Sequence, residues 1–356
     1  MSITVKTQQE LDKALAKTGY QDIIIDSPSG VWLMVTSTDG KDVSAYGSAT
    51  VRASGSATVR AYGSATVSAY DSATVRAYDS ATVRAYDSAT VSAYDSATVS
   101  AYDSATVRAY GSATVSASDS ATVRAYDSAT VSASGSATVR AYDSATVSAY
   151  DSATVRAYDS ATVSAYDSAT VRAYGSATVS AYDSATVRAY GSATVSAYGS
   201  ATVSASTYVA VHLHSSWVTV EGGVVIDVTK IDRCDVTQWA GYHGTEIQDG
   251  EVIVYKAVND DLKSGRGFAY PIGETVTCPD WDPRDACGNG LHLSPRPHHA
   301  RYYFESASRF LRCAVKLDEL TVIDGNGSGV PKLKAKRVRV LAEVDIDGNT
   351  ITKGKH

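Results

Sequence analysis

The sequence contains little phenylalanine and proline, and it lacks the motifs of several common enzyme classes. Only three Phe and seven Pro occur in 356 residues, beside 24 Tyr, so the apolar content is not that of an aromatic-rich globular core. No P-loop, GxGxxG, GxSxG or HExxH pattern is present. The usual nucleotide-binding and hydrolase mechanisms therefore have no support, and we expect no cofactor.

Long apolar segments are absent as well. The chain has no run of eighteen apolar residues, and its first ten residues are polar. We therefore expect no secretion signal and no membrane span, and a cytoplasmic location. Without a secretion signal, the cysteines are expected to be reduced thiols rather than a disulfide framework. All four follow the repeats described next: Cys234, Cys278, Cys287 and Cys313.

One octapeptide makes up nearly half of the chain. Gly/Asp-Ser-Ala-Thr-Val-Arg/Ser-Ala-Tyr/Ser occurs twenty times from Gly47 to Ser206 without an insertion or deletion. Repetition at a short fixed period is typical of a solenoid, in which each unit buries its apolar face only against its neighbours.

Two octapeptides form one coil. Eight of the ten repeat arginines recur in one column at sixteen-residue steps, and the tyrosines of that column are uninterrupted from Tyr46 to Tyr190. The other column has mostly serine at the arginine position, and Ser54, Ser118 and Ser134 replace tyrosine in it. A coil of three octapeptides would mix these columns. We therefore predict an all-β solenoid, a two-sheet β-helix with sixteen residues per coil and about ten regular coils.

Side chains alternate between the inside and the outside of each strand. Only the Ala-Val-Ala positions can line the core, because buried arginine and tyrosine columns would leave polar groups without partners. Gly or Asp then falls at the bend between the sheets. Glycine adopts positive φ there without strain, and aspartate is expected to tolerate it while bonding its own backbone.

The outward columns are the predicted binding surface. One face carries arginine and tyrosine, and the other carries mainly hydroxyl groups. Twelve bend aspartates outweigh ten arginines in the repeats, which argues against a general polyanion- or nucleic-acid-binding surface. The candidate binding residues are Arg108, Arg124, Arg140, Arg156, Arg172, Arg188, Tyr110, Tyr126, Tyr142, Tyr158, Tyr174, Tyr190, Thr114, Thr130 and Thr146.

These columns predict a non-enzymatic scaffold or binding protein. Weak contacts that recur in every coil would add up through effective concentration. Pairing of tyrosine ladders would give a homodimer, which is the first partner that we expect. An unknown protein or a glycan is the other partner class.

Different sequence flanks the repeats on both sides. Residues 1–46 are expected to cap the N-terminal end, with a helix from Thr7 to Lys17 that begins with a capping box of Thr7 and Glu10. Residues 207–231 keep the alternation of a strand and are expected to form terminal coils. Residues 232–356 are predicted to form a small α+β domain with a helix from about His298 to Ser308.

The octapeptide resembles the half-repeat of bacterial ice-nucleation proteins, which also use sixteen-residue coils with Tyr, Gly and Ser at related positions. The resemblance covers Gly47 to Ser206. It implies a solenoid and makes ice binding one functional hypothesis. Ice binding in such proteins is associated with Thr-x-Thr ranks, whereas the strands here offer Ser-x-Thr-x-Ser or Ser-x-Thr-x-Arg.

The C-terminal domain resembles an uncharacterised domain that is common in bacteria and their phages and is often coupled to short-period repeats. The resemblance implies this architecture and allows a phage association, but it supplies no activity. The motif residues are Tyr255-Lys256-Ala257, Arg266-Gly267-Phe268, Tyr270, Gly273-Glu274, Cys287, Gly290-Leu291-His292 and Tyr302-Tyr303.

An enzyme is the alternative interpretation of this domain. The segment from Gly288 to Pro295, followed by Tyr302, resembles the strand–helix element of ADP-ribosyltransferases, in which a tyrosine stacks on nicotinamide. The resemblance implies that His243 fixes the ribose, that Tyr302 is the aromatic platform and that Glu343 is the catalytic carboxylate. An effector domain on a rigid stalk would follow, and the sequence leaves this alternative open.

Two further clusters have a chemical interpretation. Cys278, Cys287 and His292 lie within fifteen residues and could bind zinc, but their spacing lacks the close pairs of structural zinc sites, so no metal is expected. The basic stretch from Lys332 to Arg339 could contact nucleic acid. Its alternating apolar positions favour instead the polar face of an edge strand, and we expect no nucleic-acid partner.

Overall fold

The computed structural model describes residues 2–19, 21–285, 287–323 and 330–351. The chain divides into two compact units, one that ends at Thr229 and one that begins at Lys230. None of the helices in the described ranges combines the length and the apolar content that a membrane crossing requires.

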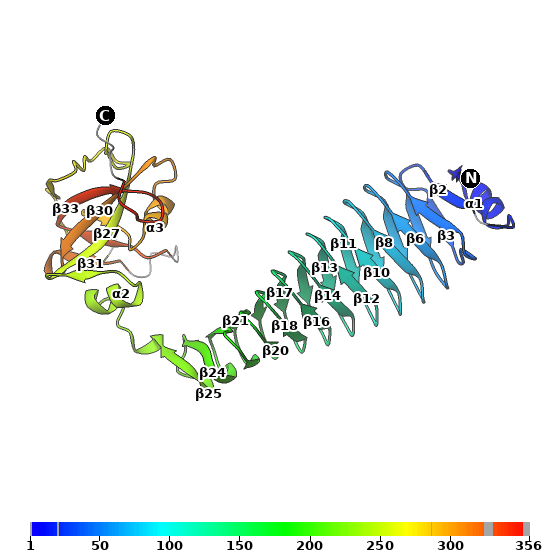
Figure 1. Ribbon diagram of the computed structural model, residues 1–356, viewed down its shortest axis with the longest axis horizontal. Coiled ribbons are helices and arrows are strands. Elements are labelled where there is room, and N and C mark those ends of the chain that lie inside the picture. Colours follow the sequence, from blue (N-terminus) through cyan, green and yellow to red (C-terminus); the bar gives the residue numbers. More distant parts are fainter. Residues whose placement is uncertain (1, 20, 286, 324–329, 352–356) are drawn as a thin grey trace. The chain divides into compact units, whose positions relative to one another are not determined.

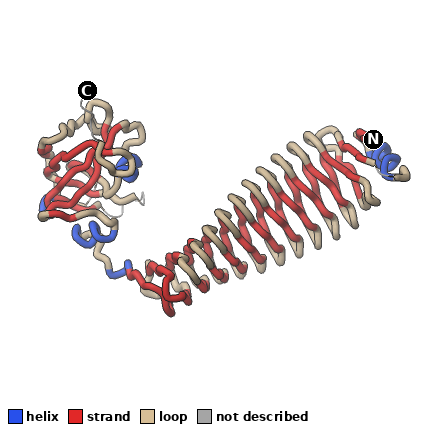
Figure 2. Tube along the Cα trace, viewed as in Figure 1, coloured by secondary structure: helices blue, strands red, loops and turns tan. Residues whose placement is uncertain are grey.

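The first unit is the predicted parallel β-solenoid (Figure 1). It starts with β1 (Ser2–Val5), α1 (Gln8–Leu15), β2 (Asp22–Ile25), β3 (Trp32–Val35) and β4 (Asp42–Ala45). Nineteen four-residue strands follow in steps of eight residues, from β5 (Thr50–Ala53) to β23 (Thr194–Ala197), and each runs from the Thr to the second Ala of its octapeptide. Figure 2 shows these strands separated by bends along both edges of the unit.

Strand pairing confirms the sixteen-residue coil. Each repeat strand pairs in parallel with the strand two places along the chain, so Thr106 in β12 (Thr106–Ala109) lies beside Thr122 in β14 (Thr122–Ala125). We call β4, β6 and so on to β22 the even stack, and β3, β5 and so on to β23 the odd stack. The two stacks are the two predicted sheets.

The core is the thin layer of alanine and valine that the alternation predicts. Ala105, Val107 and Ala109 are fully buried. The same three positions of every octapeptide are at most 1% exposed up to Val203. Burial of one valine contributes about 1.5–3 kcal/mol, so a small side chain repeated in every strand stabilises the whole array. No aromatic side chain is needed in this core.

The bends hold Gly or Asp at positive φ, as predicted, with values from 52° to 69° within the repeats. The carboxylates, however, bond to the neighbouring coil rather than to their own backbone. The Gly63 N–H donates to Asp79 Oδ2 at 3.0 Å, and the Gly111 N–H donates to Asp127 Oδ2 at 3.0 Å. This difference follows from the close stacking of bends, which brings eleven of the twelve carboxylates within hydrogen-bond distance of the amide sixteen residues earlier.

A helix covers the N-terminal end of the solenoid. Thr7 and Glu10 form the predicted capping box of α1, and Leu11 and Ala14 pack onto the first coils. The side-chain amide of Gln8 accepts from the Met34 N–H at 2.7 Å and donates to the Met34 carbonyl at 3.0 Å. Gln8 therefore occupies backbone groups at the edge of β3 much as another strand would.

The last coils have a different construction. Strand β24 (Thr202–Leu213) is one continuous strand that pairs with β22 through its first half and with β23 through its second half. Strand β25 (Thr219–Asp227) pairs with both halves, with a register irregularity between Ala205 and Ala210. Val209 and Val211 are fully buried, whereas Tyr208 and Trp217 are more than 80% exposed. The largest side chains of this segment therefore lie on the surface.

The equivalence of the octapeptides predicts two outcomes of deletion. Removal of residues 143–158 takes out one coil and leaves the arginine column in register. Removal of residues 143–150 takes out half a coil and moves every later strand to the other stack. We expect both variants to fold, because core and bends are unchanged. Only the half-coil deletion should divide the arginine column of the even stack between the two stacks.

A crystal structure of each deletion variant checks the position of the columns. Hydrogen exchange compares the folds in solution, with wild-type protein as the reference. Loss of exchange protection beyond residue 150 in the half-coil variant alone would contradict the equivalence of the two stacks.

The second unit is the predicted α+β domain. It contains a five-stranded antiparallel sheet in the order β26-β27-β30-β33-β28 and a three-stranded sheet in the order β29-β32-β31. Its elements after η1 (Val228–Lys230) are α2 (Val236–Tyr242), β26 (Ile247–Gln248), β27 (Glu251–Val258), β28 (Thr275–Thr277), β29 (Leu291–Leu293), α3 (Pro297–Tyr302), β30 (Arg309–Lys316), η2 (Leu317–Glu319), β31 (Leu320–Val322), β32 (Leu333–Ala335) and β33 (Arg337–Val344).

Two predictions for this domain were wrong. Helix α3 ends at Tyr302 rather than near Ser308, because the chain turns where the Ala307 N–H bonds to the Phe304 carbonyl. The basic stretch is not an edge strand, since β32 lies between β29 and β31 and Lys334 is fully buried. Alternation of polar and apolar residues does not distinguish an edge strand from a central strand that buries a lysine.

Candidate functional site

The even stack carries an uninterrupted ladder of ten tyrosines. Neighbouring ring centroids are 4.8–5.2 Å apart, and the ring planes differ by 7–12°. This separation follows the spacing of adjacent parallel strands. The ladder consists of Tyr46, Tyr62, Tyr78, Tyr94, Tyr110, Tyr126, Tyr142, Tyr158, Tyr174 and Tyr190.

The odd stack carries an interrupted ladder. Tyr70, Tyr86 and Tyr102 stack on one another, and a second group runs from Tyr150 to Tyr198. Serine occupies the two positions between these groups. The second group ends on the ring of His214, whose centroid is 4.3 Å from that of Tyr198.

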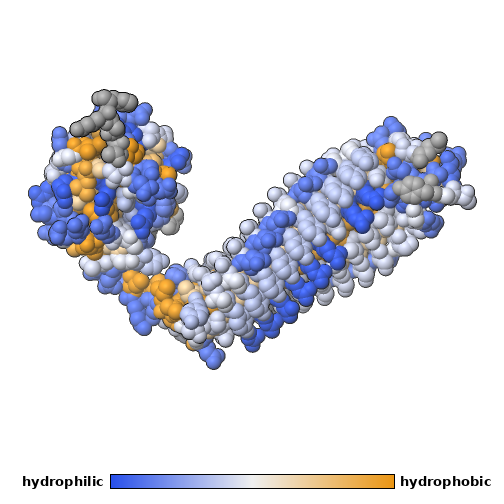
Figure 3. Space-filling model, viewed as in Figure 1, coloured by the Kyte–Doolittle hydropathy of each residue, from blue (hydrophilic) through white to orange (hydrophobic). Residues whose placement is uncertain are grey.

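The arginine column lies beside the uninterrupted ladder. Arg108, Arg124 and Arg140 are register partners in successive strands of the even stack, and each lies two residues before a ladder tyrosine. Arg60 pairs with Asp42 at 2.5 Å. Within the described residues, the other seven arginines of the column form no ion pair. Figure 3 shows rows of hydrophilic side chains along the otherwise near-neutral surface of the coils.

The hydroxyl face belongs to the odd stack. Thr114, Thr130 and Thr146 are register partners, and all three are exposed. The arginine column and the hydroxyl column therefore lie on the two separate faces that the sequence predicts. Burial raises the pKa of Tyr62, Tyr78 and Tyr110, and the neighbouring tyrosine is the next cause. These phenols stay neutral hydrogen-bonding groups at physiological pH.

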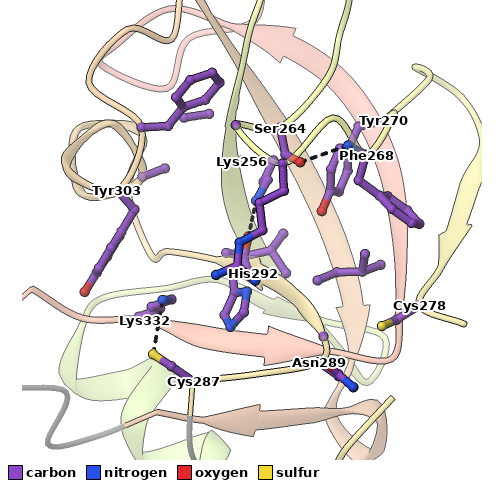
Figure 4. Close-up of a pocket in the computed structure, with 18 of the residues that line it drawn as sticks. Lys256, Ser264, Phe268, Tyr270, Cys278, Cys287, Asn289, His292, Tyr303 and Lys332 are labelled. Carbon is purple, nitrogen blue, oxygen red and sulfur yellow. Dashed lines mark hydrogen bonds between the residues drawn. The ribbon is translucent and has the colours of Figure 1, made fainter. Parts of the chain in front are cut away.

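The C-terminal domain contains a cavity of about 780 Å³. Strands β27 and β29, helix α3 and the loops before β28 and β29 supply its lining residues (Figure 4). The isolated bridge between Tyr255 and Ser294 holds β27 beside the end of β29. The cavity therefore lies where the two sheets of this domain meet.

Lys256 extends from β27 into this cavity. Its ammonium group donates to the His292 carbonyl at 2.8 Å and lies 5.1 Å from the ring centroid of Tyr270. Burial lowers the pKa of Lys256 to about 8. Burial, followed by Lys332 and Lys256, lowers the pKa of His292 to about 3, so the imidazole is neutral at physiological pH. Its Nε2 is buried without a hydrogen-bond partner among the described residues.

The suggested metal ligands all line this cavity, but both cysteines have other neighbours. The Cys278 thiol bonds to Asp280 at 3.1 Å, and the Lys332 ammonium lies 3.4 Å from Cys287 Sγ. In the part of the chain that the structure describes, no group of three His, Cys, Asp or Glu side chains could hold a metal ion. The four cysteines are free thiols.

The suggested catalytic residues lie elsewhere. His243 follows the last residue of α2, and its ring packs edge-on against Trp239. Tyr302 is 54% exposed. Glu343 accepts two hydrogen bonds from Arg309, one of them at 2.7 Å. None of the three suggested residues is among those that line the cavity, whereas Tyr303, the residue after Tyr302, is.

The sequence singled out Lys256 and Arg266 as motif residues and Lys332 as part of a basic stretch, but it gave no sign that they share a cavity. Lys256 lies in the otherwise apolar segment Val252–Val258, which is a signal that this lysine has an unusual environment. Lys332 comes from a distant segment, and its ammonium group lies 4.5 Å from the ring centroid of Tyr303. Only the folded domain brings the two lysines to one cavity.

Comparison with known proteins finds one similarity. The model of a family described as "Domain of unknown function (DUF7666)" matches residues 252–351. This agrees with the resemblance of the C-terminal domain to an uncharacterised domain. No curated protein and no solved structure matches the chain, so the resemblance of the repeats to ice-nucleation proteins stays a hypothesis.

Proposed function

We propose that the solenoid is a scaffold that binds through the tyrosine and arginine columns of its even stack, and that a second copy of the chain is its first partner. The observation that carries this proposal is the uninterrupted ladder of ten rings, since a lateral contact can be repeated in every coil. Each contact is weak, but once one coil is bound, the rigid array holds the next coil beside its partner. The affinity therefore increases with the number of coils.

Charge supports a face-to-face arrangement with two-fold symmetry. In the even stack, a bend residue follows each ladder tyrosine, and arginine stands two residues before eight of the ten tyrosines, with Ser44 and Ser92 at the other two positions. Five of these bends are aspartates, Asp79, Asp95, Asp127, Asp143 and Asp159. A two-fold axis parallel to the ladders superposes them and brings the arginine column of each copy toward the bend aspartates of the other, which favours association.

Replacement of tyrosine by serine in one ladder tests this proposal. Serine fits the position, because Ser118 and Ser134 already occupy it and keep the backbone bond to the preceding coil, at 3.0 and 2.9 Å. The triple variant Tyr110→Ser, Tyr126→Ser and Tyr142→Ser should weaken self-association at least tenfold. Three lost aromatic contacts correspond to about 1.5–4.5 kcal/mol.

The odd ladder provides the matched control. Tyr150→Ser, Tyr166→Ser and Tyr182→Ser remove the same number of rings from the other face and should leave the dimer intact. Sedimentation equilibrium measures both variants beside wild-type protein. A wild-type chain that is monomeric at high micromolar concentration contradicts self-association, and equal weakening by both triple variants contradicts the choice of face. A protein or glycan partner of the same face would then be the next hypothesis.

A further inference from the structure

The cavity of the C-terminal domain has an excess of positive charge that the scaffold does not use. Lys256, Arg266 and Lys332 line it, and Asp280 is the one carboxylate among its lining residues. That carboxylate accepts from the Cys278 thiol. None of the three cations is ion-paired with a carboxylate within the described ranges.

The contacts that the structure gives the two ammonium groups are to uncharged groups. The Lys256 ammonium has a backbone carbonyl and the face of Tyr270, and that of Lys332 has a thiol and the face of Tyr303. Desolvated cations without a counter-charge lower the stability of a fold, so a group that supplies the missing negative charge binds favourably. In Figure 4, the imidazole of His292 lies beside Lys332 and below Lys256.

The walls of the cavity are aromatic on both sides of these cations. Phe268 and Tyr270 lie on one side of His292 in Figure 4, and Tyr303 lies on the other. Phe304 from the turn after α3 adds a further apolar surface. A cavity of about 780 Å³ has room for more than an inorganic ion, and cavities of this size usually hold small organic molecules.

We propose that this cavity binds a small organic anion, whose phosphate or carboxylate group contacts Lys256, Lys332 and Arg266 and whose aromatic or other planar body lies against Tyr303 and Phe304. The neutral His292 presents its buried Nε2 to the cavity, and in the Nε2–H tautomer this group donates a hydrogen bond to the anion. Binding needs no change in the solenoid, so the proposal is independent of the tyrosine ladders.

Titration calorimetry on the full chain tests the proposal with four probes. Phenyl phosphate and benzoate carry the two candidate anions on an aromatic ring, benzamide is the neutral analogue of benzoate, and inorganic phosphate lacks the ring. We expect at least one of the two aromatic anions to bind at least tenfold more tightly than benzamide and inorganic phosphate. The stronger of the two identifies the anion.

Three variants locate the binding site. Lys256→Gln and Lys332→Gln should each weaken binding of that anion about tenfold, since one charged hydrogen bond is lost. Lys316→Gln removes the same charge from an exposed position outside the cavity and should change nothing. Lys332 is only partly buried, so its variant stays informative if Lys256→Gln fails to fold. Failure of both aromatic anions to bind, or binding that is unchanged in Lys332→Gln, would overturn the proposal.

Discussion

Val139→Asp is expected to unfold the central coils of the solenoid. Val139 is fully buried in β16 (Thr138–Ala141), and its register partners are Val123 and Val155. The interior at this point consists of alanine and valine, so a carboxylate there has no hydrogen-bond partner. An unpaired buried charge of this kind costs about 4–5 kcal/mol or more, because the fold must either bury it or open.

Thr138→Asp is the control for this substitution. Thr138 precedes Val139 in the same strand but is exposed, and the outward columns already tolerate charge. Hydrogen exchange of β14 to β18 and thermal unfolding by circular dichroism compare the two variants. Wild-type protection in Val139→Asp would show that the coil interior is not closed at this position.

Leu11→Asp is expected to release the N-terminal cap. Leu11 is fully buried and joins α1 to the core that continues through the coils. Loss of a buried leucine costs about 2–5 kcal/mol even without a new charge. Once α1 leaves, Gln8 no longer occupies the backbone groups of Met34, and the edge of β3 is free to pair with another chain.

Hydrogen exchange and light scattering measure the two consequences of Leu11→Asp. The first coils should lose protection, and larger assemblies should form. Gln9→Asp places the same carboxylate on the exposed side of α1 and should cause neither change. Assemblies that form equally in both variants would assign the effect to charge rather than to the cap.

The solenoid could be predicted almost completely because its repeats are nearly identical. A column of one residue type can be phased from the sequence, and the phase determines which strands pair and which face each residue occupies. The hydrogen-bond partner of the bend carboxylates could not be predicted. It depends on the distance between bends of neighbouring coils, which only the stacked structure shows. The continuous strand β24 did leave a signal, since Thr207 stands where each earlier octapeptide has Gly or Asp.

The C-terminal cavity was predictable only in part. Cys278, Cys287 and His292 were singled out by their closeness in sequence, and they do line one cavity. Their chemical partners come from distant segments, since Lys256 lies in β27 and Lys332 precedes β32. The pairing of β29 with β32 brings these segments together, and no short-range pattern encodes it.

The identical coils also bear on how the chain finds its native pairing. Any repeat strand can form the same backbone hydrogen bonds with many others, so these bonds do not specify the correct neighbour of a strand in the middle of the block. Unique partners exist only at the two ends, where β1 to β4 and β24 to β25 have their own sequences. Correct alignment is therefore reached most directly when folding nucleates at an end and adds one coil at a time, since nucleation in the middle permits slipped pairings that only the ends can reject.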